Sequence, residues 1–383
     1  MKYFPFILCA VLLIGCGHNP TTNEAETTSC VQPSIVFETE EAELTAPHPT
    51  PDRIRLMLNE MTLEERVGQL FLIRCNQASV LEDISAYHPG GLVLFNVDFE
   101  NQTPETMHRL LAGYQLASKT PLLLAVDEEG GTVNRISRNV AFRSSPFPSP
   151  RSAFAEGGLD LAVAIEEEKC QLMQSLGLNL NLGPVCDLTD DAGAFMYSRS
   201  IGLAPEETGE FVSRTILVKN AYRIGSALKH FPGYGNNTDT HVGIAVDSRP
   251  LEDYIQRDLI PFYAGIKAGA GCILVSHTIV EALDETMPAS LSPAVHQFLR
   301  EDMDFDGVIL TDDLVMDAIT EQYGAGEAAV LAILAGNDLL CSTEYSVQYR
   351  AVLDAVLEGR IDIDVLNAAV RHVLQWKIDL GMI

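Results

Sequence analysis

The sequence predicts an α/β protein, a single domain folded as a closed (β/α)8 TIM-type barrel. Eight short apolar runs recur along the chain, each followed by polar or glycine residues, with amphipathic stretches of helical length between them. Continuous apolar runs are typical of strands buried in a parallel sheet. An open doubly wound sheet also alternates in this way, but the count of eight favours closure, and no glycine-rich dinucleotide fingerprint follows the first run.

The predicted elements follow one another in a regular order. The strands are expected at residues 67–73, 91–95, 121–126, 178–184, 225–231, 272–276, 308–311 and 338–341. Amphipathic periodicity predicts helices at residues 104–118, 161–176, 206–223, 252–268, 325–335 and 363–380. About 330 residues follow the amino-terminal region, a length within the range of one α/β barrel.

The amino-terminal region predicts export and a lipid anchor. Residues 1–15 combine Lys2, an apolar run too short to span a membrane, and the ending Leu13-Ile14-Gly15, the pattern of a signal peptide. With Cys16 this ending resembles a bacterial lipobox, which implies cleavage before Cys16 and lipidation of its sulfur. An ordinary secretory signal is the alternative. Residues 16–50 are expected to be a flexible linker and residues 51–383 the barrel, anchored outside the cytoplasm to a bacterial cell membrane or outer membrane.

Charge and cysteine spacing exclude several classes of partner. The net charge of -28 disfavours nucleic acid and anionic lipid headgroups, which bind concentrated Lys and Arg. Outside the leader and lipobox, the cysteines are widely scattered and show no metal-binding spacing: Cys30, Cys75, Cys170, Cys186, Cys272 and Cys341. We therefore expect no disulfide, no metal and no organic cofactor. The oligomeric state is left open.

Titratable residues follow five successive predicted strands. They are Asp127, Asp187, the pair Lys229-His230, His277 and the pair Asp312-Asp313. Because active sites of such barrels lie at the carboxyl ends of the strands, one pocket is expected to gather these groups. Barrel strands often end in polar residues, but this combination favours a site for a multiply hydroxylated ligand.

The segment from Lys229 to His241 holds two imidazoles, an ammonium and a carboxylate around two glycines. Glycines free the backbone for turns, so the segment is predicted to be an active-site loop. Asp239 stands two residues before His241, so its carboxylate is able to raise the basicity of the imidazole for proton exchange with a substrate. The alternative is a polar turn whose histidines cap backbone groups.

Several motifs resemble family 3 glycoside hydrolases of the β-N-acetylhexosaminidase type. They are Lys229-His230-Phe231-Pro232-Gly233, Asp239-Thr240-His241, Thr311-Asp312-Asp313-Leu314-Val315-Met316, Asp127-Glu128-Glu129-Gly130-Gly131, Gly183-Pro184-Val185-Cys186-Asp187 and Ser198-Arg199-Ser200. Their order and spacing extend the resemblance from about residue 51 to the carboxyl terminus.

The resemblance implies roles for named residues. Asp312 is expected to be the nucleophile that forms a covalent glycosyl-enzyme, with a helix N-cap as the alternative. His241, oriented by Asp239, is expected to be the general acid/base. The sugar-binding residues are expected to be Asp127, Arg135, Arg199, Lys229 and His230, although surface salt bridging is an alternative for the two arginines. Asp187 and His277 are expected to support the pocket, and Asp313 is expected to be structural or to cap a helix.

The implied activity is that of a retaining exo-β-N-acetylglucosaminidase acting on glycans, peptidoglycan fragments among them. Two departures from the family concern the acid/base loop, because Tyr234 stands where a His is common and the loop is one residue shorter. Three alternatives remain: phosphorolysis in the second step, a Schiff-base lyase that uses Lys229, and a catalytically weak glycan-binding lipoprotein. The expected partners are a carbohydrate and, through the lipid anchor, a membrane.

Overall fold

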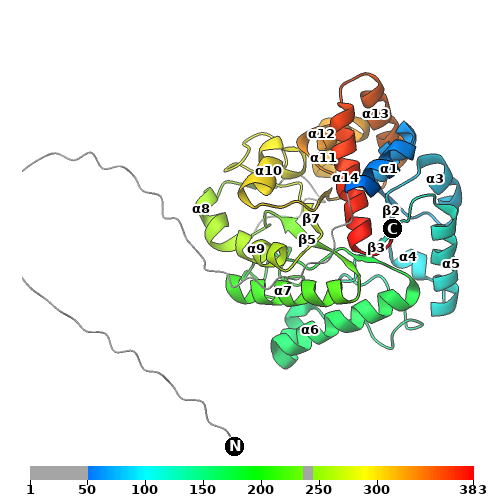
Figure 1. The fold of residues 1–383 in the computed structure, drawn as a ribbon. Coiled ribbons are helices and arrows are strands. Elements are labelled where there is room, and N and C mark those ends of the chain that lie inside the picture. The colour runs from blue at the N-terminus through cyan, green and yellow to red at the C-terminus, as the bar shows by residue number, and fades with distance from the viewer. Residues whose placement is uncertain (1–50, 236–244) are drawn as a thin grey trace, which may run out of the picture. The chain divides into compact units, whose positions relative to one another are not determined.

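The computed structural model describes residues 51–235 and 245–383, which form a barrel of parallel strands surrounded by helices (Figure 1). The main sheet has eight strands in the order β10-β1-β2-β3-β4-β5-β7-β9. A parallel bridge between Leu310 and Leu339 brings the two edges of this sheet together, so the barrel is nearly closed and the predicted fold class is confirmed. The barrel strands are β1 (Phe71–Arg74), β2 (Gly91–Leu94), β3 (Leu123–Val126), β4 (Leu180–Asn181), β5 (Gly225–Phe231), β7 (Cys272–Val275), β9 (Val308–Thr311) and β10 (Leu340–Ser342).

Helices connect the strands and cover the outside of the barrel. They are α1 (Pro51–Glu60), α2 (Leu63–Gln69), α3 (Val80–Tyr87), α4 (Asn96–Phe99), α5 (Pro104–Ala117), α6 (Pro150–Leu176), α7 (Pro205–Ala221), α8 (Leu251–Asp253), α9 (Leu259–Lys267), α10 (Pro293–Gln297), α11 (Asp317–Tyr323), α12 (Ala325–Ala335), α13 (Tyr345–Leu357) and α14 (Ile363–Asp379). Shorter elements are the π-helical turns η2 (Tyr254–Asp258) and η4 (Phe298–Asp302), the 3₁₀ turn η3 (Ala289–Leu291), and a small sheet of β6 (Val246–Asp247) and β8 (Ile279–Val280).

Some predicted boundaries were wrong. The first strand begins at Phe71, because Thr62 and Glu65 form a capping box that starts α2, and this helix includes residues 67–69. The fourth strand contains only Leu180 and Asn181. The helix predicted at 161–176 is the second part of α6, where Gly157 and Gly158 interrupt the helical backbone.

The inside of the barrel is filled by apolar side chains from alternate positions of the strands, among them Leu72, Val93 and Leu310. Val373 and Trp376 of α14 extend this cluster. Trp376 lies against the amino ends of the strands, where a Cβ atom at Gly271 would be 2.1 Å from its Nε1. Since this end is packed by α14, the opening of the barrel is at the carboxyl ends of the strands.

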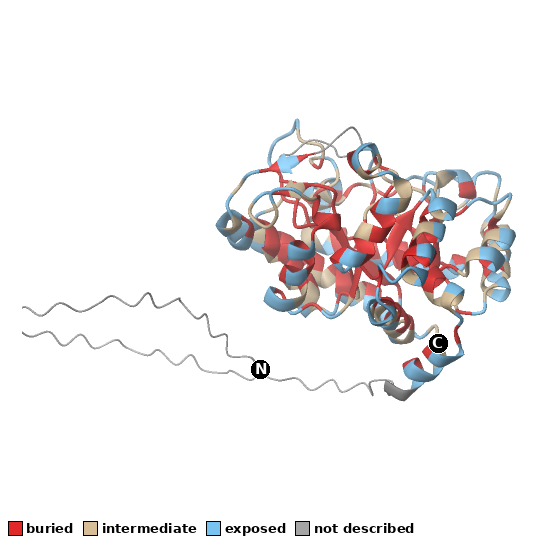
Figure 2. Ribbon diagram, turned by 90° about the horizontal axis from the view of Figure 1, so that it is seen from above, coloured by how far each residue is buried: buried red, intermediate tan, exposed pale blue. Residues whose placement is uncertain are grey.

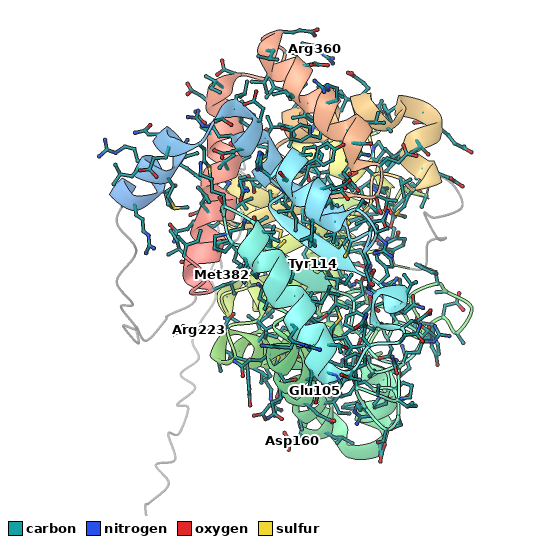
Figure 3. The ribbon with its side chains drawn as sticks, turned by 90° about the vertical axis from the view of Figure 1, so that its right-hand side faces the viewer. Glu105, Tyr114, Asp160, Arg223, Arg360 and Met382 are labelled. Atoms are coloured by element: carbon teal, nitrogen blue, oxygen red, sulfur yellow. The ribbon has the colours of Figure 1, made fainter. Side chains whose placement is uncertain are left out.

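A second apolar layer lies between the strands and the helices. Figure 2 shows buried residues concentrated in the strands and on the inner faces of the helices. In Figure 3 the side chains of Asp160 and Arg360 lie on the outside of the molecule, and both residues are exposed, whereas Tyr114 of α5 is buried. In residues 51–235 and 245–383, no helix has the length and apolar character that a membrane span requires.

Five cysteines lie in the described part of the chain, and all of them are buried free thiols: Cys75, Cys170, Cys186, Cys272 and Cys341. Burial raises the pKa of the Cys75 and Cys170 thiols to about 12, so both are held as neutral thiols. Cys30, like the predicted lipidation residue Cys16, lies outside the described residues. The described cysteines therefore act as small apolar core residues.

Candidate active site

A cavity of about 650 Å³ opens at the carboxyl ends of the barrel strands. Six of the predicted site residues line it: Asp127, Arg135, Arg199, Lys229, His230 and Asp312. Lys229 and His230 belong to β5, whereas Asp127 follows β3 and Asp312 follows β9. The structure therefore brings together groups that are far apart in the sequence, in a space that accommodates a sugar ring.

A cluster of ion pairs forms the floor of the cavity. The Lys229 Nζ atom lies 2.6 Å from both Asp127 Oδ1 and Glu129 Oε1. Arg199 binds Glu129 through two hydrogen bonds, from Nε at 2.9 Å and from Nη2 at 2.6 Å. Two cations and two carboxylates thus neutralise one another, which makes their burial possible.

The charges in this cluster reinforce one another. Burial alone would raise the pKa of the Glu129 carboxyl, but the neighbouring Arg199 and Lys229 cations outweigh it and lower that pKa well below the usual value. Burial alone would lower the pKa of Lys229, but Asp127 and Glu129 raise it. A Schiff-base nucleophile must be a neutral amine, so the raised pKa of Lys229 argues against the lyase alternative.

Asp187 orients His230. Its Oδ2 atom lies 2.7 Å from His230 Nδ1 and also accepts a hydrogen bond from the His230 backbone NH, at 3.2 Å. The other ring nitrogen, Nε2, lies 3.1 Å from Nη2 of Arg199. Because a guanidinium only donates, Nε2 is the acceptor and Nδ1 carries the proton. Asp187 also accepts from the Tyr234 backbone NH at 2.8 Å, so one buried carboxylate fixes the loop after β5.

Arg135 is positioned by a turn that the buried carboxylate of Glu128 organises. Glu128 accepts hydrogen bonds from the backbone NH groups of Arg135 at 2.8 Å and Ile136 at 2.7 Å, and from Ser137. The Arg135 guanidinium lies 5.3 Å from the centre of the Phe95 ring, within the range of a cation–π contact. Neither Arg135 nor Arg199 is part of a surface salt bridge in the described structure.

Asp312 lies on the cavity wall, directly after β9, and its Oδ1 accepts a hydrogen bond of 2.9 Å from the Asp313 NH. Asp313 braces the neighbouring loops, because its carboxylate accepts from the Val315 NH at 3.1 Å and from the Thr343 hydroxyl at 2.5 Å. The backbone oxygen of Asp313 lies 3.0 Å from His277 Nε2. His277 lies outside the cavity lining, behind the loop that carries Asp312.

The predicted acid/base residues Asp239 and His241 lie outside the described residues. Within the described ranges, no group of His, Cys, Asp and Glu side chains has the arrangement of a metal site.

Sequence reasoning did not single out several residues that line the cavity, Glu129 and Phe95 among them. Glu129 belongs to the same motif as Asp127 and stands two residues after it. In an extended segment this spacing places both side chains on the same side, and it is the signal that would have identified Glu129. Phe95 was expected only as the last residue of a strand, and its contacts with arginines distant in sequence carry no local signal.

Comparison with known proteins agrees with this geometry. The sequence profile of the glycosyl hydrolase family 3 N terminal domain matches residues 62–376. The chain belongs to glycosyl hydrolase family 3. A beta-hexosaminidase of Xanthomonas campestris pv. campestris is 32% identical over 293 residues, which cover 75% of this chain and 86% of the relative. The beta-hexosaminidase LpqI of Mycobacterium tuberculosis is 27% identical over 381 residues, 96% of this chain and 95% of the relative.

Solved structures of family 3 proteins have the same fold. A β-N-acetylglucosaminidase from Paenibacillus sp. superposes with a TM-score of 0.79 at 29% identity, over 84% of this chain and 63% of that protein. Mycobacterium tuberculosis LpqI superposes with a TM-score of 0.75 at 27% identity, over 85% of this chain and 96% of LpqI. The predicted family and the prediction of a glycoside hydrolase are thereby confirmed.

Proposed function

We propose that this family 3 glycoside hydrolase is a retaining exo-β-N-acetylglucosaminidase that removes terminal β-linked N-acetylglucosamine from glycans, peptidoglycan fragments among them. The observation that carries the proposal is the position of Asp312 on the wall of the cavity that also contains Asp127, Lys229, Arg199 and His230. The names of the Xanthomonas, Mycobacterium and Paenibacillus relatives support the hexosaminidase activity.

In this mechanism the carboxylate of Asp312 attacks the anomeric carbon of the terminal sugar. The bond from that carbon to the leaving oxygen breaks, and His241, oriented by Asp239, gives a proton to this oxygen. A water molecule then gives its proton to His241 and attacks the same carbon, which releases Asp312. Two inversions at the anomeric carbon retain its configuration.

The ion cluster binds the sugar. Lys229 and Arg199 donate hydrogen bonds to sugar hydroxyls, the Asp127 carboxylate accepts them, and His230 and Arg135 complete the ring of partners. Charged groups make the strongest hydrogen bonds of this kind, and they disfavour analogues that lack the hydroxyl. Because the cluster is balanced in charge, it suits an uncharged terminal sugar.

The test is hydrolysis of a chromogenic β-N-acetylglucosaminide beside the corresponding β-glucoside. We expect the wild type to hydrolyse the acetamido sugar and not the glucoside. Asp312→Asn should lower the rate of hydrolysis by at least about a thousandfold. His241→Ala should lower it in part, and a substrate with a good leaving group should restore the rate. Asp306→Asn is the matched control, since Asp306 is exposed, precedes the same strand and lies outside the cavity. Turnover in Asp312→Asn equal to that of Asp306→Asn would refute the assignment of the nucleophile.

The same assay separates the alternatives. Product that forms only with inorganic phosphate, as a sugar 1-phosphate, would identify a phosphorolytic enzyme. Binding of N-acetylglucosamine without turnover would identify a glycan-binding lipoprotein.

We also propose that Cys16 is lipidated and that residues 16–50 tether the barrel to a bacterial membrane, outside the cytoplasm. The lipobox pattern of the sequence supports this proposal. Cys16→Ser should move the protein from the membrane fraction to the soluble fraction, whereas Cys30→Ser should not. Equal membrane retention of both variants would count against the anchor.

A further inference from the structure

Two lysines and one glutamate form a buried charge cluster on α6 and α7, the helices that lie side by side in Figure 1. Glu166 and Lys169 belong to α6 and Lys219 belongs to α7, and each residue is at most 5% exposed. The Lys169 Nζ atom pairs with Glu166 Oε1, and the Lys219 Nζ atom lies 3.9 Å from Glu166 Oε2. None of these three described residues lines the active-site cavity. Burial of charges is costly and their pairing offsets the cost only in part, so the cluster calls for an explanation.

Lys169 holds the backbone of Glu129. Its Nζ atom donates to the Glu129 backbone oxygen at 2.7 Å, and the Glu129 NH donates to the Val133 oxygen at 3.0 Å. Both backbone polar groups of Glu129 thus have partners, while its carboxylate binds Lys229 and Arg199 in the cavity. A shift of this backbone would displace the carboxylate that holds both cations.

Lys219 holds the segment that follows β4. Its Nζ atom donates to the Gly183 backbone oxygen at 2.8 Å, and the same oxygen accepts a hydrogen bond from the Ala227 NH of β5 at 3.1 Å. Four residues later in this segment, Asp187 accepts from the backbone NH of His230 and orients its ring. Lys219 therefore fixes the backbone that leads to the carboxylate behind His230.

The cluster has no room for a ligand of its own. The cavity beside Glu166 and Lys219 has a volume of about 10 Å³, about the size of one water molecule. Burial lowers the pKa of Lys219 from 10.5 to about 8, although the nearby Glu166 carboxylate opposes this shift, so the cluster does not favour the charged amine. The two backbone oxygens that it holds are what explain it.

We propose that Lys169 and Lys219, joined through Glu166, are positioning residues that hold the sugar-binding groups in place from behind the site. This inference rests on the proposed function, because those groups bind the terminal sugar. Asp312 follows β9, which neighbours neither β3 nor β4 in the sheet. Loss of either lysine should therefore weaken binding of the sugar more than it slows the chemical step.

The test measures kcat and KM for the chromogenic N-acetylglucosaminide, together with the inhibition constant of free N-acetylglucosamine. In Lys169→Met we expect KM and the inhibition constant each to rise about tenfold, as the loss of one hydrogen bond from a charged donor implies. The value of kcat should change by less than about threefold, because the lost interaction binds ground state and transition state alike. Lys219→Met should raise both constants in the same direction.

Lys377→Met is the matched control, because Lys377 is also a fully buried lysine of a helix that packs on the barrel. Its Nζ atom donates to Gln69 at the closed end, and it lies outside the active-site cavity. A merely structural role for Lys169 would change the melting temperature without a rise in either constant. Equal constants in Lys169→Met and Lys377→Met would overturn the inference, and turnover by the wild type in that experiment would leave the proposed function intact.

A double variant keeps the test possible if Lys169→Met does not fold. Glu166→Leu combined with Lys169→Met replaces the buried pair by apolar side chains, so neither charge of the pair is left without its partner. Because the donor to the Glu129 oxygen is still missing, KM and the inhibition constant should rise as in the single variant. Wild-type constants in the folded double variant would refute the positioning role.

Discussion

At the scale of single residues, the site depends on charges that neutralise one another. Lys229 contacts two carboxylates, and one of these, Glu129, also accepts hydrogen bonds from two of the three guanidinium nitrogens of Arg199. Each charged side chain therefore has a fixed partner and keeps other donors or acceptors available. A sugar hydroxyl is able to donate and accept at once, so it fits such a surface better than a purely apolar or purely anionic ligand does.

The first prediction concerns Asp187, which orients His230 without lining the cavity. Asp187→Ala removes the acceptor for His230 Nδ1, so the ring loses the tautomer that offers Nε2 to Arg199. We expect kcat/KM for the chromogenic glucosaminide to fall by about tenfold to a hundredfold, as the loss of a buried hydrogen-bond partner implies.

The control for this prediction is Asp190→Ala, in the same loop but exposed. A merely structural role for Asp187 would lower the melting temperature without lowering kcat/KM. If both variants keep the wild-type kcat/KM, Asp187 does not orient the site.

The location of most of the charged cavity residues was predictable from the sequence, because the carboxyl ends of the strands in a barrel converge. Asp127, Lys229 and Asp312 each follow or end an apolar run, and the fold alone brings them together. The pairing of Arg74 with Asp98 was not predictable in the same way. Arg74 directly follows the first predicted strand, but nothing in the sequence relates it to Asp98, 24 residues later, and only the packing of the loops shows that they are partners.

At the scale of elements, the loop after β3 does more than carry Asp127. Glu129 pairs with Arg199 in the ion cluster. The adjacent Glu128 points to the opposite side and accepts a hydrogen bond from the backbone NH of Arg135. The loop then turns at two glycines, Gly130 and Gly131, whose φ values of 99° and 64° lie in the left-handed region that favours glycine.

A second prediction tests this loop. A Cβ atom at Gly130 would lie 2.1 Å from the Pro148 backbone oxygen, and its backbone conformation disfavours any other residue. Gly130→Ala should therefore lower the free energy of unfolding by about 2 kcal/mol or more. The melting temperature and the activity should fall together. Gly113→Ala is the control, because a Cβ at this position of α5 would have no atom within 4 Å, and alanine favours a helix. Equal melting temperatures for the two variants would contradict the account of the turn.

The elements themselves were largely predictable, and their exceptions have physical causes. All eight apolar runs contain a strand of the barrel. The first strand was predicted to begin too early, because Val67 and Leu70 are apolar residues buried at the end of a helix. Periodicity alone does not separate a helix end from a strand within one short apolar run. The strands β6 and β8 were missed because each contains two residues, too few for a pattern.

At the scale of the whole molecule, the closed end of the barrel holds a lysine that has no carboxylate partner among the described residues. Lys377 of α14 is fully buried, and its Nζ donates to Gln69 Oε1 at 2.7 Å. Burial lowers the pKa of this lysine from 10.5 to about 7. Between these two values the unfolded chain binds a proton that the folded protein does not, so this residue makes stability rise with pH in that range.

The third prediction follows from this linkage. Lys377→Met removes the titrating group. The difference in melting temperature, variant minus wild type, should therefore be larger at pH 6 than at pH 9, by at least about 2 °C. The lost hydrogen bond to Gln69 is common to both conditions and cancels. Lys119→Met serves as the control, since its side chain is 62% exposed. A difference between variant and wild type that is constant from pH 6 to pH 9 would refute the prediction.

The closure of the barrel has a consequence for how the protein is made. Phe71 of β1 pairs with Leu340 of β10, although most of the chain lies between them. Helix α14, which packs against α1 and against the end of the barrel, comes later still in the sequence. A chain that is still being synthesised thus has an unpaired β1 edge until residues 340–342 have emerged. Contacts so distant in sequence slow folding. Because Thr343, just after β10, lines the active-site cavity, that cavity is also completed only when β10 has joined β1.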